Sequence, residues 1–291
     1  MHRFLLHNGQ ILDTHEKSLS AGQVGLLNGW GVFSTLRVAD GVLFAFERHW
    51  DRMQRDAAKV HVPFPQDAAQ LKSELLSLVE ANSAWNATLR VVVVRNRGGM
   101  FEGPDQERDF DVLAFTKDLN PWGDSVRLGI KANARYAANE FSGCKILSWS
   151  QNLTWAEEAQ RQGFDEVVLL NERGEVSECT SANIFAASGG EVYTPPLDSG
   201  CLPGVTRELL LEVVQAPGIQ VMERTLNPQD LERADQVFIT STTRDLLPAV
   251  FIEGLKIRNE GNVADRLVKA LEDYRMEYVR RNAVRLIGQL G

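Results

Sequence analysis

The sequence predicts an α/β (α+β) protein with a small α/β domain and a larger mixed-sheet domain. The length of 291 residues suits one large domain or two moderate ones. Apolar runs with the period of a strand alternate with runs of helical period along the chain. A polar stretch rich in Pro and Gly interrupts both periods near residue 120. We therefore place the small domain at residues 1–118, the linker at 119–124 and the larger domain at 125–291.

The first domain is expected to form a sheet accompanied by helices. Its N-terminal residues predict a strand, a tight turn at Asn8-Gly9 and a second strand. A glycine-punctuated loop follows, and Asp40-Gly41 predicts a hairpin turn between two more strands. The β-branched run TLRVVVVRN predicts a buried strand. The expected strands are 32–39, 42–46, 88–96 and one near Val112, and the expected helices are 47–59 and 67–81.

The second domain is expected to mix short strands with helices. The expected strands are 126–132, 166–170, 184–187 and 237–239, and the expected helices are 152–162, 206–215 and 263–285. The last of these helices carries both charge signs and ends with basic residues, as suits a surface helix whose C-terminus favours cations.

The composition argues against several classes of protein. The net charge of −8 and the lack of a basic stripe are unlike a general nucleic-acid binder. No apolar run reaches the roughly 20 residues that span a bilayer, and the N-terminus lacks the pattern of a signal peptide, so we expect a cytoplasmic protein. The 3 cysteines, Cys144, Cys179 and Cys201, lack CxxC spacing and indicate neither a disulfide framework nor a metal site.

Three features in a fixed order indicate the chemistry. Lys145 precedes the helix at 152–162, Glu178 precedes a strand, and Pro203-Gly204 opens onto the helix at 206–215. A lysine amine can form a Schiff base with a carbonyl cofactor, a carboxylate can hold a protonated pyridine nitrogen, and backbone N–H groups at a helix start suit a phosphate. Singly, each feature is as typical of a solvated side chain or an ordinary turn. Their order together favours a carbonyl cofactor that carries a phosphate.

These residues resemble the fold-type IV (class IV) pyridoxal-phosphate enzymes, which include branched-chain aminotransferases, D-amino-acid aminotransferases and aminodeoxychorismate lyases. The family's mark is a glutamate, several small residues and then Asn-aliphatic-Phe, and the run from Glu178 to Phe185 is similar to it. Thr-Pro follows at 194–195, and Leu-Pro-Gly-aliphatic-Thr-Arg follows at 202–207. The family's Schiff-base lysine precedes the glutamate, as Lys145 precedes Glu178 by 178 − 145 = 33 positions. The resemblance covers nearly the whole chain.

The resemblance implies how the cofactor, pyridoxal 5'-phosphate, would be held. Lys145 would be the catalytic residue and the Schiff-base partner, and Glu178 would face the ring nitrogen. Arg52 lies in a segment similar to the family's His-x-x-Arg-Leu and would contact the phosphate bidentately, with Arg48 and Arg55 as competitors. The other cofactor contacts that the resemblance implies are Leu202, against a face of the ring, and Gly204, Val205, Thr206 and Thr242, at the phosphate.

The resemblance also implies contacts with the substrate carboxylate. Thr243 follows Thr242 in a segment similar to the family's strand-to-turn segment, although a Ser/Thr turn ahead of a short helix would have the same composition. Arg90, Arg95 and Arg97 compete for this role. On a strand, Arg95 and Arg97 would share one face and Arg90 would take the other.

The resemblance implies an aminotransferase that moves an amino group from an amino acid to a 2-oxo acid such as 2-oxoglutarate, with ping-pong kinetics and a homodimeric assembly. Trp30, Phe33 and Trp149 could line an apolar pocket, which favours branched-chain or other apolar substrates and makes Phe33 a substrate-binding candidate. Three alternatives stay open. Phe-Ser-Thr at 33–35 and Arg-x-Arg-Gly-Gly at 95–99 are more similar to aminodeoxychorismate lyases, and Ser-Thr-Thr at 241–243 is similar to D-amino-acid aminotransferases. The third is a non-catalytic cofactor-binding protein.

Overall fold

The computed structural model describes residues 1–16, 19–20, 22–104 and 107–288, with side chains as far as Ala283. Contacts divide the chain into two compact units. The first unit contains Met1–Asn120, Cys144–Trp149 and the chain from Arg275 onward, and the second contains Pro121–Gly143 and Ser150–Tyr274. The division after Asn120 falls inside the expected linker, whereas the boundaries drawn from the sequence assign 144–149 and 275–291 to the second domain.

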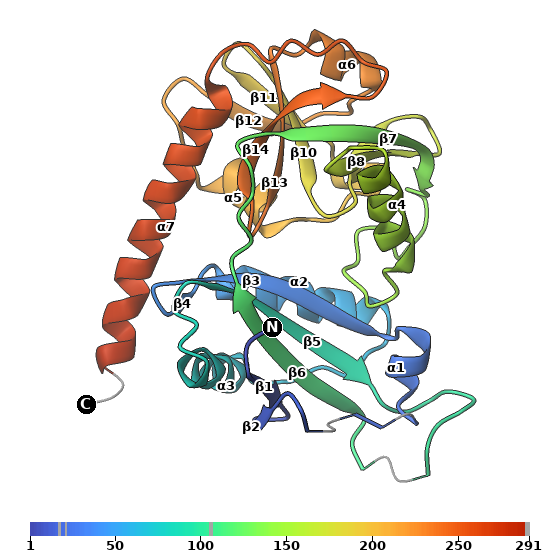
Figure 1. The fold of residues 1–291 in the computed structure, drawn as a ribbon, viewed down its shortest axis with the longest axis vertical. Helices are drawn as coiled ribbons and strands as arrows, with labels where there is room; N and C mark the ends of the chain where they lie inside the picture. The colour runs from blue at the N-terminus through green and yellow to red at the C-terminus, as the bar shows by residue number, and fades with distance from the viewer. Residues whose placement is uncertain (17–18, 21, 105–106, 289–291) are drawn as a thin grey trace. The chain divides into compact units, whose positions relative to one another are not determined.

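The first unit is built, in the described residues, on a six-stranded antiparallel sheet (Figure 1). Its strands follow the order β2 (Gln10–Asp13), β1 (Phe4–His7), β6 (Phe110–Asp118), β5 (Ala87–Arg95), β3 (Gly31–Ala39) and β4 (Val42–Leu43). In the pair of β3 and β5, Phe33 lies opposite Val92, and Thr35 lies opposite Arg90. The hairpin turns expected at Asn8-Gly9 and Asp40-Gly41 are both present.

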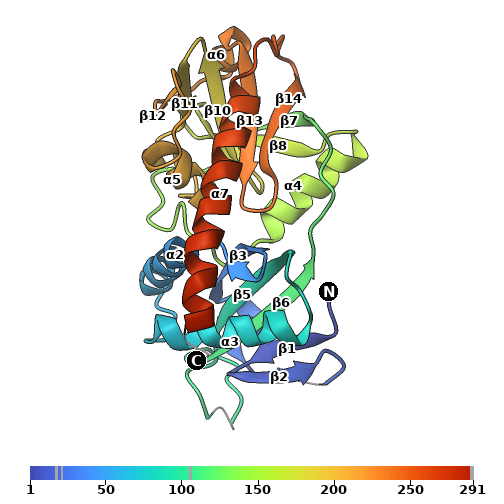
Figure 2. The same cartoon turned by 90° about the vertical axis from the view of Figure 1, so that its left-hand side faces the viewer.

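Helices α2 (Phe46–Lys59) and α3 (Ala68–Ala81) cover one face of this sheet (Figure 2). Alternate residues of β3 and β5 point into this core, because successive side chains of a strand point to opposite faces. The core includes Val32, Leu36, Leu89, Val91 and Val93 from the strands and Trp50, Met53, Leu75 and Leu78 from the helices. The opposite face carries a separate apolar cluster of Phe33, Val92, Val94 and Leu113, against which Leu147 and Trp149 pack.

Two local expectations for the first unit are wrong. The strand expected at 42–46 ends at Leu43, because Ala45 adopts a left-handed conformation (φ 53°) that turns the chain into α2 at Phe46. The glycine-punctuated loop before β3 contains a short helix, α1 (Val24–Asn28), which ends at Gly29 in the left-handed conformation (φ 61°). Glycine adopts this conformation at little steric cost, so the residue that suggested a loop is the C-terminal cap of a helix.

The second unit contains, in its described residues, an eight-stranded mixed sheet. The strand order is β12 (Gln220–Glu223), β11 (Glu191–Thr194), β10 (Asn183–Ser188), β13 (Gln236–Ser241), β14 (Asp245–Ile252), β7 (Val126–Arg135), β8 (Glu166–Asn171) and β9 (Val176–Cys179). The pairs β11–β12, β14–β7 and β7–β8 are parallel, and the other neighbours are antiparallel. The mixed sheet is therefore confirmed, and β13 leads into β14 through a turn rather than into a short helix.

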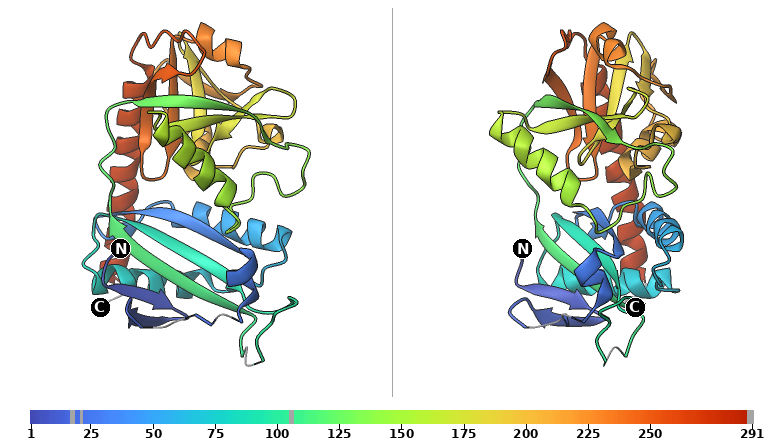
Figure 3. Two further views of the ribbon diagram at one scale, coloured as in Figure 1. Left: turned by 45° about the vertical axis from the view of Figure 1, so that its right-hand side comes forward. Right: turned by 90° about the vertical axis from the view of Figure 1, so that its right-hand side faces the viewer.

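Helices pack on both ends of this sheet (Figure 3). The apolar residues of α4 (Ser150–Arg161) pack on β8, with Ala159, Val167 and Leu169 in one cluster. Helix α5 (Val205–Glu212) contacts β12 and β13, and α6 (Pro228–Arg233) contacts β10. The last helix, α7, spans Val263–Gly288. Among the described residues, no helix is long and apolar enough to cross a membrane.

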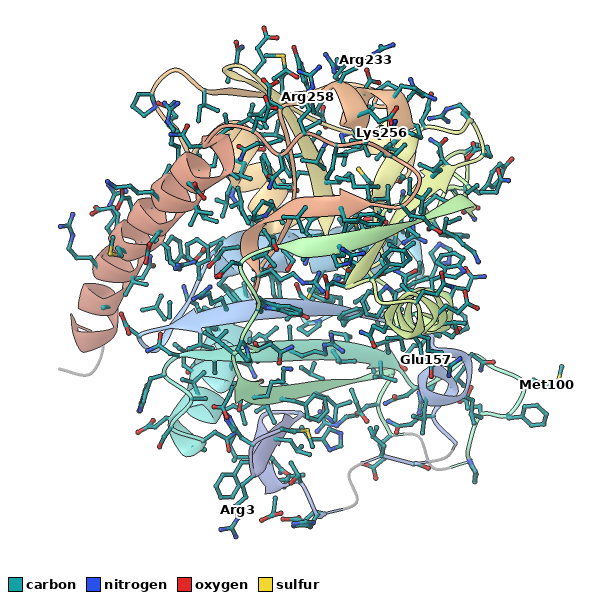
Figure 4. The ribbon with its side chains drawn as sticks, turned by 45° about the horizontal axis from the view of Figure 1, so that its top comes forward. Arg3, Met100, Glu157, Arg233, Lys256 and Arg258 are labelled. Atoms are coloured by element: carbon teal, nitrogen blue, oxygen red, sulfur yellow. The ribbon has the colours of Figure 1, made fainter. Side chains whose placement is uncertain are left out.

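The loop between β5 and β6 carries exposed apolar side chains. Met100 lies at its tip and points away from the sheet (Figure 4), with 91% of its surface exposed. Phe101 beside it is 74% exposed. Within β5 and β6 themselves, the aliphatic side chains are buried, and Phe110 and Phe115 are half-buried.

Helix α2 is joined to β3 by a buried polar contact. Ser34, His49 and Arg52 are all at most 4% exposed. Arg52 Nη2 donates to Ser34 Oγ over 2.7 Å, and Ser34 Oγ lies 2.8 Å from His49 Nδ1. The arginine occupies one of the two acceptor positions of the serine, and the tautomer of His49 sets whether the serine hydroxyl donates to Nδ1 or accepts from it. Burial, and then the charges of Arg52 and Lys145, hold the pKa of His49 well below its usual range.

We expect acid to destabilise the protein through His49. Its pKa in the folded chain lies below its pKa in the unfolded chain, so the unfolded chain takes up the proton first as the pH falls. The stability that the neutral imidazole contributes is present above about pH 6.5 and is lost as the pH falls from there toward the lower folded-state pKa. In urea denaturation, the unfolding free energy of the wild type should fall more steeply below this pH than that of His49→Gln. Exposed His15 supplies the control, His15→Gln, which should keep the wild-type slope. Equal slopes for the wild type and His49→Gln would contradict the prediction.

Candidate active site

The segment Cys144–Trp149 carries Lys145 and lies along β3 in the first unit. Ile146 forms an isolated antiparallel β-bridge with Val32. Phe33 N donates to Lys145 O over 3.1 Å, and Leu147 N donates to Gly31 O over 2.9 Å. A β-carbon at Gly31 would lie 2.5 Å from Leu147 Cδ1 and 2.5 Å from Val93 O. Only glycine therefore lets the segment approach the strand this closely.

The backbone of Lys145 is also held from the side of α2. Its N–H donates to Asp56 Oδ2 over 2.9 Å, and Asp56 is 1% exposed. The same carboxylate accepts from Arg55 Nη2 over 2.7 Å. The backbone of Lys145 is thus held by hydrogen bonds to β3 on one side and to α2 on the other. A precisely placed amine needs this kind of support.

The Lys145 amine lies among aromatic rings on the face of the sheet away from α2. Its Nζ is 4.6 Å from the centre of the Phe33 ring and 5.3 Å from that of Trp149. These rings meet edge to face, with centres 5.6 Å apart. The guanidinium of Arg90 lies 4.8 Å from the same Phe33 ring. The structure therefore brings Lys145, Phe33 and Arg90 together.

The competing arginines lie elsewhere in the first unit. Arg95, at the end of β5, stacks over Trp30 at 4.1 Å and donates to His61 O and Arg97 O. Arg97 lies beyond the end of β5 and pairs with Asp109 at 3.4 Å. The expectation that Arg95 and Arg97 share one face of a strand is therefore wrong, because the strand ends at Arg95. The geometry favours Arg90 for any ligand that reaches Lys145.

Glu178 lies on β9 in the second unit and is 8% exposed. Arg135 Nε donates to its Oε1 over 2.9 Å, and the backbone N–H of Leu202 donates to its Oε2 over 3.0 Å. Arg135 also donates from Nη2 to Asn152 Oδ1 over 3.2 Å. These donors orient the carboxylate, and its remaining lone pairs can accept a further hydrogen bond.

The start of α5 is shaped for a close approach. Gly204 is the N-cap residue, and because it has no side chain it makes no capping hydrogen bond to the first turn. Val205 and Thr206 begin the helix. A β-carbon at Gly204 would lie 2.0 Å from Asn183 Oδ1, whose amide group donates to Leu202 O over 2.8 Å. The N–H groups of the first helical turn suit an anion.

The turn between β13 and β14 contains Thr242 and Thr243, both half-buried. Thr240, at the end of β13, lies opposite Asn183 and is 1% exposed. Its Oγ1 has no hydrogen-bond partner among the described residues. Since buried hydroxyls are usually hydrogen-bonded, this one is a donor available to a ligand.

The cysteines beside these motifs are neutral thiols. Burial, with a smaller effect of the Glu178 charge, raises the pKa of Cys201 to about 11. Burial also raises the pKa of Cys179 and that of Cys144. In the described part of the chain, no group of His, Cys, Asp and Glu side chains could hold a metal ion.

Sequence reasoning missed Arg135 and Thr240. Arg135 is far from Glu178 in the chain, and the parallel pairing of β7 with β8 is what places the two near one another. Thr240 belongs to the Thr/Ser-rich segment already singled out, but only its burial separates it from Thr242 and Thr243.

Comparisons with known proteins show which family the chain belongs to. Residues 31–252 match the model of the family described as amino-transferase class IV. A Methanocaldococcus jannaschii protein named provisionally as a branched-chain-amino-acid aminotransferase is 29% identical over 93% of this chain and 96% of its own. D-alanine aminotransferase of Bacillus licheniformis is 28% identical over 87% of this chain and 89% of its own.

The fold agrees with that of a solved relative. The branched-chain amino acid aminotransferase of Escherichia coli superposes with a TM-score of 0.84 over 94% of this chain and 95% of its own, at 24% sequence identity. The fold-type IV architecture expected from the sequence is therefore confirmed. Since the family model matches 222 of 291 residues (252 − 31 + 1 = 222), the chain is an enzyme that belongs to the class IV aminotransferase family.

Proposed function

We propose that this enzyme moves an amino group between a branched-chain or other apolar amino acid and a 2-oxo acid such as 2-oxoglutarate. The observation that carries the proposal is the surroundings of Lys145, whose amine lies against the rings of Phe33 and Trp149. Aromatic and aliphatic walls favour apolar ligands, and a few polar groups fix their orientation. Arg90 beside Phe33 supplies one positive charge for a substrate carboxylate.

Class IV aminotransferases use pyridoxal phosphate, and so does this chain. A solved Mycobacterium tuberculosis relative with a TM-score of 0.82 and 21% identity is described as a PLP-bound form. The residues present fit this cofactor. The unpartnered Thr240 hydroxyl and the bare N-terminus of α5 suit its phosphate, and the oriented Glu178 carboxylate suits its ring nitrogen.

We assign the cofactor contacts as follows. Lys145 would bind the cofactor's aldehyde, Glu178 would supply a carboxylate to its ring nitrogen and Leu202 would pack on its ring. Arg52, which is buried on α2, belongs to the phosphate contacts. The other phosphate contacts are Gly204, Val205, Thr206 and Thr242, and Thr240 joins them on the strength of its buried hydroxyl.

When bound, pyridoxal phosphate supplies an electron sink for negative charge at the amino acid's α-carbon. The chain's own residues do the rest. The Lys145 amine, once free, would take up the α-proton of the amino acid as a base and carry it as an ammonium group that can give it up again as an acid. The rings of Phe33 and Trp149 lie against this amine and shield part of it from water. Arg135 and the Leu202 N–H keep the Glu178 carboxylate in one orientation. Arg90 and Thr243 bind the substrate carboxylate.

Two further expectations belong to the proposal. The family resemblance favours a homodimer, and the sequence favours a cytoplasmic location.

A panel of amino donors tests the substrate class. With 2-oxoglutarate as acceptor, L-leucine and related apolar amino acids should show the highest kcat/KM, because the walls near Lys145 are apolar. D-alanine and aminodeoxychorismate are the discriminating controls. The Bacillus licheniformis relative makes a D-amino acid a real competitor, and pyruvate release from aminodeoxychorismate without an acceptor would instead indicate a lyase. Preference for either compound over leucine would overturn the proposed substrate.

Replacing the lysine tests the catalytic assignment. Lys145→Ala should abolish both the visible absorbance of the lysine-bound cofactor and the half-reaction with an amino donor, because no other amine takes its place. Lys131→Ala is the control, since Lys131 is half-exposed on β7 and pairs with Glu158 at 3.5 Å. It should keep both signals. A Lys145→Ala protein that retained them would remove the central assignment.

Replacing the glutamate tests the ring-nitrogen contact. Glu178→Gln should still bind the cofactor but lower kcat on the order of a hundredfold, the scale for losing one preorganised electrostatic partner. Glu158→Gln, on the exposed side of α4, should leave kcat unchanged. Wild-type turnover in Glu178→Gln would rule out the contact.

A further inference from the structure

We propose that the buried ion pair between Glu166 and Arg244 is a positioning element that fixes the turn Thr242–Thr243 for ligand binding. The inference rests on the aminotransferase activity proposed above, because that activity gives the turn its ligands. All the residues involved belong to the second unit.

Glu166 is an unusual residue for the start of a buried strand. It opens β8, where every residue is buried, and it is only 2% exposed. A buried carboxylate is costly unless charges and hydrogen-bond donors surround it. Glu166 is surrounded in this way. It accepts hydrogen bonds from the Ser181 backbone N–H over 2.9 Å, from the hydroxyls of Thr180 and Ser181, and from Arg244 Nη1 over 3.2 Å.

Arg244 is held on several sides. It is the last residue of the turn between β13 and β14, and its side chain is 9% exposed. Nη1 donates to both Glu166 Oε1 and Ser181 Oγ, the latter over 2.9 Å. The guanidinium also stacks on the ring of Trp122 at 4.1 Å. Since Thr242 and Thr243 directly precede Arg244, this anchoring restricts the backbone of the turn.

The same contacts reach the segment that carries Glu178. Thr180 and Ser181 follow β9, on which Glu178 lies. Asn152 Nδ2 donates to Thr180 O over 2.6 Å, and Asn152 in turn accepts from Arg135, the ion-pair partner of Glu178. A continuous series of hydrogen bonds therefore runs from Glu178, the carboxylate assigned to the ring nitrogen, through Glu166 to Arg244, which ends the turn that contains Thr242 and Thr243. Fully satisfied networks of this kind hold their members rigidly.

Stability alone does not account for the pair. Replacing a buried ion pair with apolar side chains is often neutral or stabilising, so such pairs are weak evidence of a role in stability. The pair instead fixes the orientation of the two side chains, because a carboxylate and a guanidinium form hydrogen bonds in only a narrow range of geometries. Free movement of even one residue of the turn would weaken ligand binding about tenfold, judged from the entropy of ordering a backbone.

The experiment is a double-mutant cycle on cofactor-free protein. Glu166→Gln, Arg244→Gln and the double variant are titrated with pyridoxal phosphate by fluorescence, and their thermal unfolding without ligand is recorded. Arg244→Lys joins the series because it keeps a positive charge beside Glu166 but loses the planar guanidinium that stacks on Trp122 and donates to Ser181. KM and kcat are then measured for the amino donor in the loaded enzymes. The control cycle uses Arg173 and Glu175, an ion pair of 2.6 Å at the opposite end of β8 with 42% and 21% side-chain exposure.

Each single variant should raise the Kd for pyridoxal phosphate, and the KM for the amino donor, about tenfold. Arg244→Lys should lie between the wild type and Arg244→Gln. The Kd and KM of the double variant should be no higher than those of the more impaired single variant, because both substitutions break the same ion pair. The control variants should leave the Kd and KM within about twofold of the wild type.

Two results would overturn the inference. One is a Kd near the wild-type value in variants whose unfolding temperature has fallen, since that marks a role in stability alone. The other is a double variant whose effect is the product of the single effects. A wild type that binds pyridoxal phosphate but transfers no amino group would defeat the proposed function instead, and the Kd comparison would still decide the positioning role.

Discussion

The placement of Lys145 depends on the pairing of a six-residue segment with β3. The sequence of this segment does not predict a strand. The segment lies beside β3 because Gly31 leaves room for Leu147 and because the Asp56 carboxylate accepts a hydrogen bond from the Lys145 N–H. Both supports come from residues far away in the chain. The role proposed for this amine, as a base and then as an acid, needs such support, since a small displacement of a reacting group reduces its rate strongly.

The two faces of the sheet in the first unit have different tasks. The face toward α2 and α3 buries the main apolar core, and the polar contact of Ser34, His49 and Arg52 joins helix to strand within it. The other face presents Phe33 and Arg90 next to Lys145. Because successive side chains of a strand alternate, Ser34 and Phe33 serve opposite faces from adjacent positions. One strand thus serves both stability and the site.

In the second unit, the charges that matter to the site are buried and each has a defined partner. Glu178 pairs with Arg135, and Glu166 pairs with Arg244. A carboxylate removed from water keeps its charge only if donors replace the water. The donors here come from strands, turns and a helix that are distant in sequence. The cost of burial is thus offset by contacts that also fix the orientation of the groups a ligand would meet.

The sequence by itself determined the order of most elements. It also indicated which side chains could take part in chemistry. Turn dipeptides, β-branched runs and helical periodicity are local signals, so the hairpins, β5 and α3 could be predicted from them. Lys145, Glu178 and the Gly204 turn were proposed because their order along the chain is itself a signal. A left-handed Ala45 and a glycine that caps α1 gave no such signal, because their conformations depend on the surrounding packing.

Only the tertiary structure decided which side chains meet. Strand alternation already placed Arg90 and Arg95 on opposite faces, but only the structure shows that Arg90 lies beside Phe33 while Arg95 stacks on Trp30. Arg135, Thr240 and the Glu166–Arg244 pair could not be found from the sequence, because strand pairing creates their contacts between residues far apart in the chain. Local signals report the conformation of a segment, whereas a site depends on distances between segments, and those are set by the packing of the whole unit.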